Sequence, residues 1–207
     1  MAAPNALRRS QKSHRAILDA ALCLCAEQGY GNVTVEAIAA RAGVSKKTIY
    51  RWWPTKGAVV LEALHEWRED AMTFPDTGDI VADLQAQLEI LNEFMTGPRG
   101  AAYTGLIAES QHDERLAHAL ADRFIRPRNE VTLARLRTAQ EQHELAVDAD
   151  LPLLVERLYG PIHYRILLHL GPYSRSSIRA LITETLGPLQ AAASWPISTP
   201  VVQSSSS

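Results

Sequence analysis

The apolar residues of the first third of the chain recur at intervals of three and four, which is the spacing of one buried side of an α-helix. They predict a helix over residues 11–28, and Gly29 follows directly as a residue type that commonly ends helices. The apolar positions that set the pattern are Ile17, Ala21, Leu24 and Cys25. This side of the helix should therefore face a core.

Two short helices are predicted next, over residues 34–42 and 45–53. Thr34 and Ser45 stand at their starts, where a hydroxyl can accept a hydrogen bond from a free backbone N–H group. Gly43 lies in the bend between them and can take a positive φ without strain. Two helices joined by so tight a turn predict a helix-turn-helix motif.

The rest of the chain also shows helical spacing, interrupted by glycine and proline. Pro127 is expected to kink or split the longest of its helices, and Pro161 lies inside another. No run of alternating β-branched residues predicts a strand. We therefore expect an all-α fold of about nine helices, the later ones over about residues 55–73, 79–95, 101–111, 113–143, 150–170 and 174–192.

Charge divides the chain into two unlike parts. Residues 1–56 hold nine Lys or Arg and three Asp or Glu, a net charge of +6, whereas residues 57–207 hold twelve and twenty, a net charge of −8. A basic head on an acidic body indicates that the head binds a polyanion. We expect a helix-turn-helix domain over residues 1–56, linked by the helix over about 55–73 to a helical domain over 57–193. Residues 194–207 end in four serines and should be disordered.

The sequence also limits where the protein works and what it contains. Its apolar runs are far shorter than the ~18 residues of a membrane span, and no apolar region of a signal peptide follows the first cations. We expect a cytoplasmic protein without a membrane partner. Cys23 and Cys25 lie two apart on the predicted helix and do not face each other. They are interpreted as small apolar residues, with a redox switch as the alternative, and no metal or cofactor is expected.

The helix over residues 45–53 has two unlike sides. Ile49 and Trp53 lie on one side and should pack on the preceding helices. The opposite side carries Lys46, Lys47, Tyr50 and Arg51. Such a surface fits the major groove of DNA, where a lysine can donate to guanine and a tyrosine ring can contact a thymine methyl group.

Three more residues are candidates for phosphate contacts. Thr34, Thr48 and Lys56 stand near helix N-termini, where hydroxyls, backbone N–H groups and the helix dipole attract phosphates. The helix that starts near Lys56 follows the reading helix by only a few residues, so any tilt of it should move the reading helix.

The stretch "ILDAALCLCAEQGYGNVTVEAIAARAGVSKKTIYRWWPTKGAVVLEAL" resembles the DNA-binding domain of the tetracycline-repressor (TetR) family of bacterial transcriptional regulators. The resemblance covers roughly residues 12–64. It implies a homodimeric repressor that binds double-stranded DNA at a palindromic operator and is released by a small ligand in the C-terminal domain. By matching position, it implies DNA contacts from Thr34, Ser45, Lys46, Lys47, Thr48, Tyr50 and Lys56.

The chain departs from the family pattern at one place. Many members carry histidine where this chain has Trp52, whose ring is expected either to stack beside the DNA backbone or to pack inward. Trp53 takes the usual place of a phenylalanine and should lie in the core.

The segments "AESQHDERLAHALADRFIRPRNEVTLARLRTAQEQHEL" and "LYGPIHYRILL" resemble one C-terminal subtype of this family. In that subtype the last two helices pair with those of a second protomer, which implies residues 150–170 and 174–192 here. The side chains expected in this dimer interface are Leu158, Ile162, Ile166, Leu170, Leu181, Ile182, Leu186 and Leu189.

The resemblance also implies a pocket within the C-terminal bundle for a small apolar or amphipathic effector. Pockets of this kind are mostly apolar with a few polar groups. The candidates are Phe94, Met95, Tyr103, Ile107, Phe124, Tyr159, His163 and Tyr164. Each is also an ordinary core or interface residue by its type, and His163 has a pH switch as a further alternative.

Two other classes of protein remain as alternatives. An enzyme is not expected, because the chain lacks a nucleophile elbow G-x-S-x-G, a phosphate loop G-x-x-x-x-G-K and the zinc motif H-E-x-x-H. A ligand-independent or non-specific architectural DNA-binding protein would share the basic head. Competition by random DNA would separate it from a sequence-specific regulator, because phosphate contacts dominate the salt dependence of both.

Overall fold

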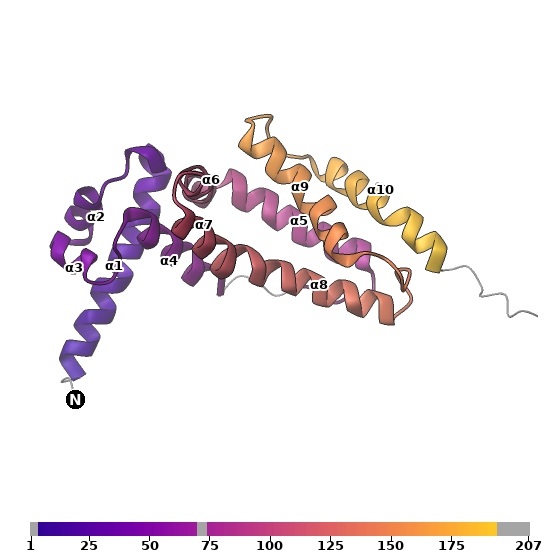
Figure 1. Ribbon diagram of the computed structural model, residues 1–207, viewed down its shortest axis with the longest axis horizontal. Helices are drawn as coiled ribbons and strands as arrows, with labels where there is room; N and C mark the ends of the chain where they lie inside the picture. Colours follow the sequence, from indigo (N-terminus) through magenta and orange to yellow (C-terminus); the bar gives the residue numbers. More distant parts are fainter. Residues whose placement is uncertain (1–3, 70–73, 194–207) are drawn as a thin grey trace, which may run out of the picture.

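The computed structural model describes residues 4–69 and 74–193, and over these residues the chain is helical without a strand. The prediction of an all-α fold is confirmed. Figure 1 shows a small head formed by the first helices, in indigo and violet, and an elongated bundle formed by the later ones. The predicted disorder of residues 194–207 concerns a segment outside the described residues.

The head closely follows the predicted helices. Its elements are α1 (Pro4–Gln28), the 3-10 turn η1 (Tyr30–Asn32), α2 (Val35–Ala42) and α3 (Lys46–Tyr50). α1 begins earlier than predicted, at a proline whose fixed φ suits the start of a helix. α3 ends earlier than predicted, because the N–H of Trp52 bonds to the carbonyl of Ile49 at 2.9 Å, the three-residue spacing that tightens a last turn.

The bundle follows the head through helix α4 (Lys56–Glu69). α10 packs along α5 and α9, while α8 packs against α9 (Figure 1). α6 contacts α1, η1 and α4, so it joins the bundle to the head. The bundle helices are α5 (Ile80–Thr96), α6 (Pro98–Ser110), α7 (Glu114–Leu120), α8 (Arg126–Glu141), α9 (Leu151–Leu167) and α10 (Arg175–Ala193). Within the described residues, none of the helices is both long and apolar enough to cross a bilayer.

Polar side chains cap these helices, and two of the caps, Thr34 and Ser45, were predicted. Oδ1 of Asp79, for example, accepts hydrogen bonds from the N–H groups of Val81 and Ala82, both at 3.0 Å. Each cap satisfies an N–H group that the helix itself leaves free. The other capping side chains are Thr34, Ser45, Thr55, Asp113, Asp150 and Ser174.

The expected break at Pro127 takes the form of a π-helical turn. This turn, Ala121–Ile125, joins α7 to α8, and Pro127 stands in the first turn of α8. Proline has no N–H group to donate, and its ring excludes the carbonyl four residues earlier, here that of Arg123. The wider turn accommodates both effects, so the helical path continues.

One hydrophobic core runs through both parts of the molecule. Ile17 of the head and Leu84 of the bundle are both fully buried members of it. Cys25 is buried as expected, and burial raises the pKa of its thiol to about 11. Cys23 is exposed, and both thiols are free.

Arg135 of α8 is the centre of a buried ion network that ties α8 to α5. Its side chain is 4% exposed, and its Nε donates to Oδ2 of Asp83 at 2.8 Å. One of its Nη atoms donates to Glu144 at 3.0 Å. Burial alone would raise the pKa of Asp83, but the hydrogen bonds from Thr77 and Arg135 outweigh it and hold that pKa below its usual range.

Candidate nucleic-acid interface

The turn between α2 and α3 has the predicted geometry. Gly43 takes a φ of 65°, in the left-handed region, and the N–H of Val44 bonds to the carbonyl of Ala39 at 3.0 Å. This pattern closes many helices that end at glycine. It ends α2 within one residue and lets α3 start at once from its cap, Ser45.

α3 presents an apolar side to the core and a polar side to solvent, as predicted. Ile49 is fully buried, and Trp53, just beyond the helix, is 6% exposed. Tyr50 is 52% exposed although it is aromatic, so its ring adds little to folding and is available to a partner. The exposed neighbours on this side are Lys46, Lys47 and Arg51.

A shallow hollow of about 420 Å³ lies on this exposed side. It brings together four of the predicted DNA contacts and one residue outside that prediction, Arg51. The lining residues are Ser45, Lys47, Thr48, Tyr50 and Arg51. Cations, hydroxyls and one ring in a single hollow suit the phosphates and base edges of DNA.

Lys46 is exposed but already has a partner in α2. Its Nζ lies 2.8 Å from Oε1 of Glu36, and the hydrogen bond between them raises the pKa of Lys46 and lowers that of Glu36. Both side chains face solvent, where ion pairs of this kind are weak. A contact of Lys46 with DNA would first require this pair to open.

Lys56 lies in a different place from the α3 side chains. Its Nζ donates to the carbonyl of Tyr30 at 3.2 Å and lies 4.5 Å from the centre of that ring. Glu109 of α6 is 3.8 Å from the same Nζ, and the Lys56 side chain is only 24% exposed. The structure thus engages Lys56 at the contact between head and bundle, where we expected a phosphate contact.

Trp52 packs inward, which was one of its two expected roles. Its ring is partly buried, with its centre 5.3 Å from that of His14 in α1 and 5.4 Å from that of Trp53. The guanidinium of Arg51 lies 5.1 Å from the centre of the Trp52 ring. Trp52 therefore packs on α1 and contacts Arg51, the residue that follows α3.

The bundle brings four of the candidate effector residues together around a small cavity. Tyr103, Phe124, Tyr159 and His163 line a space of about 130 Å³ between α6, α8 and α9. Phe94 packs on the rings of Tyr103 and Phe124, at 5.6 and 6.2 Å between centres. Tyr164, in contrast, is 58% exposed.

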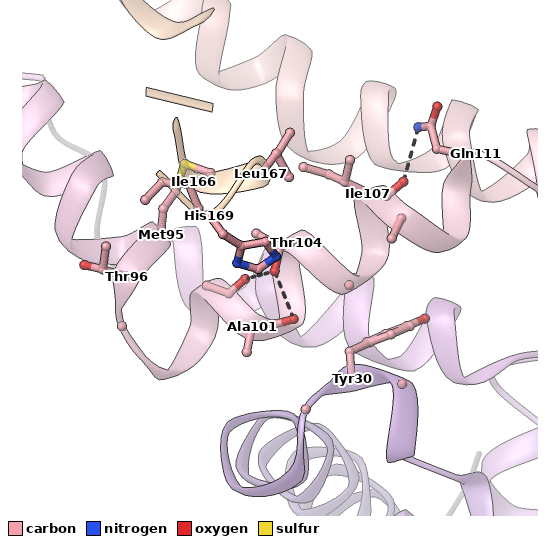
Figure 2. A pocket seen from close by; sticks show the side chains of 16 residues that line it. Tyr30, Met95, Thr96, Ala101, Thr104, Ile107, Gln111, Ile166, Leu167 and His169 are labelled. Carbon is pink, nitrogen blue, oxygen red and sulfur yellow. Dashed lines mark hydrogen bonds between the residues drawn. The ribbon is translucent and has the colours of Figure 1, made fainter. Parts of the chain in front are cut away.

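The other two candidates line a groove between the head and the bundle (Figure 2). This groove has a volume of about 910 Å³ and is bounded by η1, α6 and the end of α9. Met95 and Ile107 belong to it, together with Tyr30 and His169. The candidates for effector binding therefore fall at two places and do not form one pocket.

One group of side chains has the composition of a metal site. His14 of α1 and Glu62 and Glu66 of α4 place one ligand atom each within 4.8 Å of one another. These groups already have partners, because Nδ1 of His14 lies 3.4 Å from Glu66 and Glu62 pairs with Arg123 of the π-helical turn. A search for local motifs did not find the group, because α1 and α4 are far apart in the sequence.

The residues expected in a dimer interface differ in how far they are buried within the protomer. Leu158, Ile162, Ile182 and Leu186 are fully buried inside the protomer, so their side chains already pack within this chain. Leu170 is 49% exposed. The three that are partly buried are Ile166, Leu181 and Leu189.

Known proteins match both parts of the chain. The family model for bacterial regulatory proteins of the tetR family matches residues 17–63, and the model for the tetracyclin repressor-like C-terminal domain matches residues 74–185. The chain belongs to the TetR family. Like other TetR-family members, it is a DNA-binding transcriptional regulator and not an enzyme.

Relatives of this TetR-family chain match it over most of their length. The HTH-type transcriptional regulator YdeS of Bacillus subtilis (strain 168) is 36% identical over 183 residues, which cover 88% of this chain and 92% of YdeS. The DNA-binding transcriptional repressor TetR of Mycobacteroides abscessus is 29% identical, covering 86% and 94% of the two chains. The crystal structure of the TetR family transcription regulator SCO0332 matches with a TM-score of 0.73 and 36% identity, covering 86% and 98%.

Proposed function

We propose that this regulator is a cytoplasmic homodimeric repressor that binds a palindromic operator through α3 and leaves it when a small effector binds the bundle. The observation that carries the proposal is the joint exposure of Lys47, Tyr50 and Arg51 around one hollow. The cations can bind phosphates while Tyr50 contacts base edges. In a dimer, the two helices would read half-sites about 34–36 Å apart, roughly one turn of DNA, or a multiple of it.

The head and the bundle would divide this work. We place the boundary at residue 56, with DNA binding before it and effector binding and dimerisation over residues 57–193. The change of charge at this point supports the division, since the net charge is +6 up to residue 56 and −8 after it. DNA would attract the head and repel the bundle.

An exposed apolar surface on α9 and just after it supports the dimer. These side chains are between 38% and 58% exposed, which is unusual for so many large apolar groups along one helix. They are Leu153, Tyr164, Leu167, Leu168 and Leu170. The interface would use this outward side of α9 beside α10, while the inward side, with Leu158 and Ile162, stays in the protomer core.

α6 is the element through which an effector would act on the head. Tyr103 of α6 lines the small cavity, and Glu109 of the same helix lies against Lys56. Between them, Gly105 lies so close to η1 that an added Cβ would stand 2.2 Å from Cβ of Tyr30. A shift of α6 would therefore move the head and change the spacing of the two reading helices in a dimer.

The proposal is tested by selecting binding sites from random duplex DNA at near-physiological salt. An enriched palindrome with two half-sites at the spacing above is expected. Uniform, salt-sensitive binding without an enriched motif would instead favour a non-specific architectural protein.

A further inference from the structure

The cavity of about 130 Å³ in the bundle is lined by one arginine, Arg128, two of whose nitrogens find no acceptor among the described residues. Arg128 of α8 lines it together with Tyr103, Phe124, Tyr159 and His163. Nε and one Nη atom of Arg128 are buried and hydrogen-bonded to no atom of the described chain. Among the described residues no carboxylate forms an ion pair with this guanidinium, whose neighbour is the face of the Tyr159 ring at 5.2 Å.

Asn129 and the exposed Glu156 also line the cavity. The hydroxyls of Tyr103 and Tyr159 and the ring of His163 have hydrogen-bond partners within the protein. Nδ1 of His163 lies 2.9 Å from the carbonyl of Tyr159, which can only accept, so Nδ1 carries the proton. In the neutral ring Nε2 then accepts from the hydroxyl of Tyr103 at 3.0 Å. The hydroxyl of Tyr159 is bonded to that of Thr132 at 2.8 Å. Nε and one Nη atom of Arg128 are thus donors without an acceptor in the described part of the chain.

Buried N–H groups without acceptors are costly, so the two nitrogens of the half-buried Arg128 call for an acceptor from an occupant of the cavity. Burial lowers the pKa of His163, and the nearby Arg128 charge lowers it further, so the imidazole stays neutral and adds no second cation. The walls are aromatic, from Tyr103, Phe124 and Tyr159. In another protein an apolar cavity of about 150 Å³ holds benzene, so this one has room for a single ring or a short alkyl chain.

We propose that this cavity binds a small monocarboxylate, whose two oxygens accept hydrogen bonds from Nε and Nη of Arg128 and whose ring or short chain lies between the aromatic walls. The flat guanidinium fork matches a carboxylate in just this way. The inference rests on the proposed function in that it names the chemical class of the effector. The cavity is linked to the head through α6, because this helix carries both Tyr103, which lines the cavity, and Glu109, which lies against Lys56.

The test uses the full-length protein without DNA. Calorimetric titration with benzoate and hexanoate is compared with benzamide and hexanamide, which keep the shape and lose the charge, and with inorganic phosphate. We expect at least one of the two carboxylates to bind about tenfold or more tightly than its amide, since hydrogen bonds to charged groups are the strong ones. Arg128→Met should weaken that binding by about tenfold or more.

Two further variants serve as controls for Arg128→Met. Arg126→Met is the matched control on the same helix, because Arg126 is exposed and pairs with Asp122, and it should bind as the wild type does. Arg128→Lys keeps the charge without the fork and should bind at an intermediate level. The melting temperature of unliganded Arg128→Met should equal or exceed that of the wild type, because two buried N–H groups without acceptors have been removed.

Several results would overturn the inference. They are equal binding of amides and carboxylates, binding of neither or of phosphate alone, unchanged binding in Arg128→Met, or a large loss of stability in that variant. Binding of the selected duplex by the unliganded protein is measured separately. If that binding is intact while carboxylates fail, the inference alone is wrong. If the wild type binds no duplex specifically, the proposed function is wrong.

Discussion

At the scale of single residues, Tyr50 is the side chain on which base reading depends most. Its exposed ring and hydroxyl can contact a base edge, whereas the cations beside it bind any phosphate. Tyr50→Ala should therefore weaken binding to the selected operator by about 1–3 kcal/mol and relax the preference at one base pair. Fluorescence anisotropy on the operator and its single-base variants measures both effects.

Lys47 provides the matched comparison in the same hollow. Lys47→Ala should weaken binding to all duplexes alike and lower the slope of log affinity against log salt by about one. Base preference should not change. If Lys47→Ala altered base preference and Tyr50→Ala did not, the two roles would be reversed.

The sequence and the structure predict different roles for Lys56. A phosphate contact would make Lys56→Met lower the salt slope of DNA binding by about one. The structure places its ammonium between Tyr30 and Glu109, so the variant should instead lower the melting temperature of the DNA-free protein and leave that slope unchanged. Thermal unfolding and salt titrations of the same preparation decide between the two.

At the scale of elements, α6 must lie close to the head for any signal to pass. Gly105→Ala would place a Cβ 2.2 Å from Cβ of Tyr30, a distance that real atoms do not tolerate. The variant should be less stable by about 1–3 kcal/mol, the usual cost of overpacking, as measured by urea unfolding. Gly31→Ala in η1 meets nothing within 4 Å and is the control. Equal effects of the two substitutions would contradict a tight contact between α6 and η1.

The link between α5 and α8 depends on a buried ion network. Arg135→Met leaves Asp83 buried without its charge partner, so the free energy of unfolding should fall by about 3–5 kcal/mol. Arg137→Met, at an exposed position of the same helix, should change it little.

The network also predicts how acid affects stability. The folded pKa of Asp83 lies below its unfolded value of about 3.9. The ionised Asp83 carboxylate therefore stabilises the fold fully above that value, and this stabilisation is lost as pH falls through the folded pKa. Unfolding curves of the wild type should show this loss, and those of Arg135→Met should show less of it. An identical pH dependence would mean that Arg135 does not set the Asp83 pKa.

At the scale of the whole molecule, the dimer depends on the exposed side of α9. Tyr164→Arg should give a monomer and weaken operator binding, because a dimer would have to bury the new charge within an apolar interface. Val147→Arg is the control, since Val147 is 87% exposed between α8 and α9. Sedimentation equilibrium measures the mass, and a dimeric Tyr164→Arg protein would place the interface elsewhere.

Sequence patterns predicted the parts of this molecule that depend on near neighbours. The caps Thr34 and Ser45, the left-handed Gly43 and the two sides of α3 follow from residues within a few positions, and the structure has them. The place of Lys56 did not follow, because its partners Tyr30 and Glu109 are far from it in the sequence. The lack of acceptors for two nitrogens of Arg128 within the described residues could not be predicted either, since it depends on how α8 packs against α9.

The measurement that tests the central claim most directly is the affinity of the protein for its selected duplex relative to a scrambled one at about 0.15 M salt. Specific regulators typically favour their sites by about 1,000-fold or more. We expect a ratio of that size, with two protomers on each duplex in the same titration. Equal affinities would contradict the account, because α3 would then bind phosphates without reading bases.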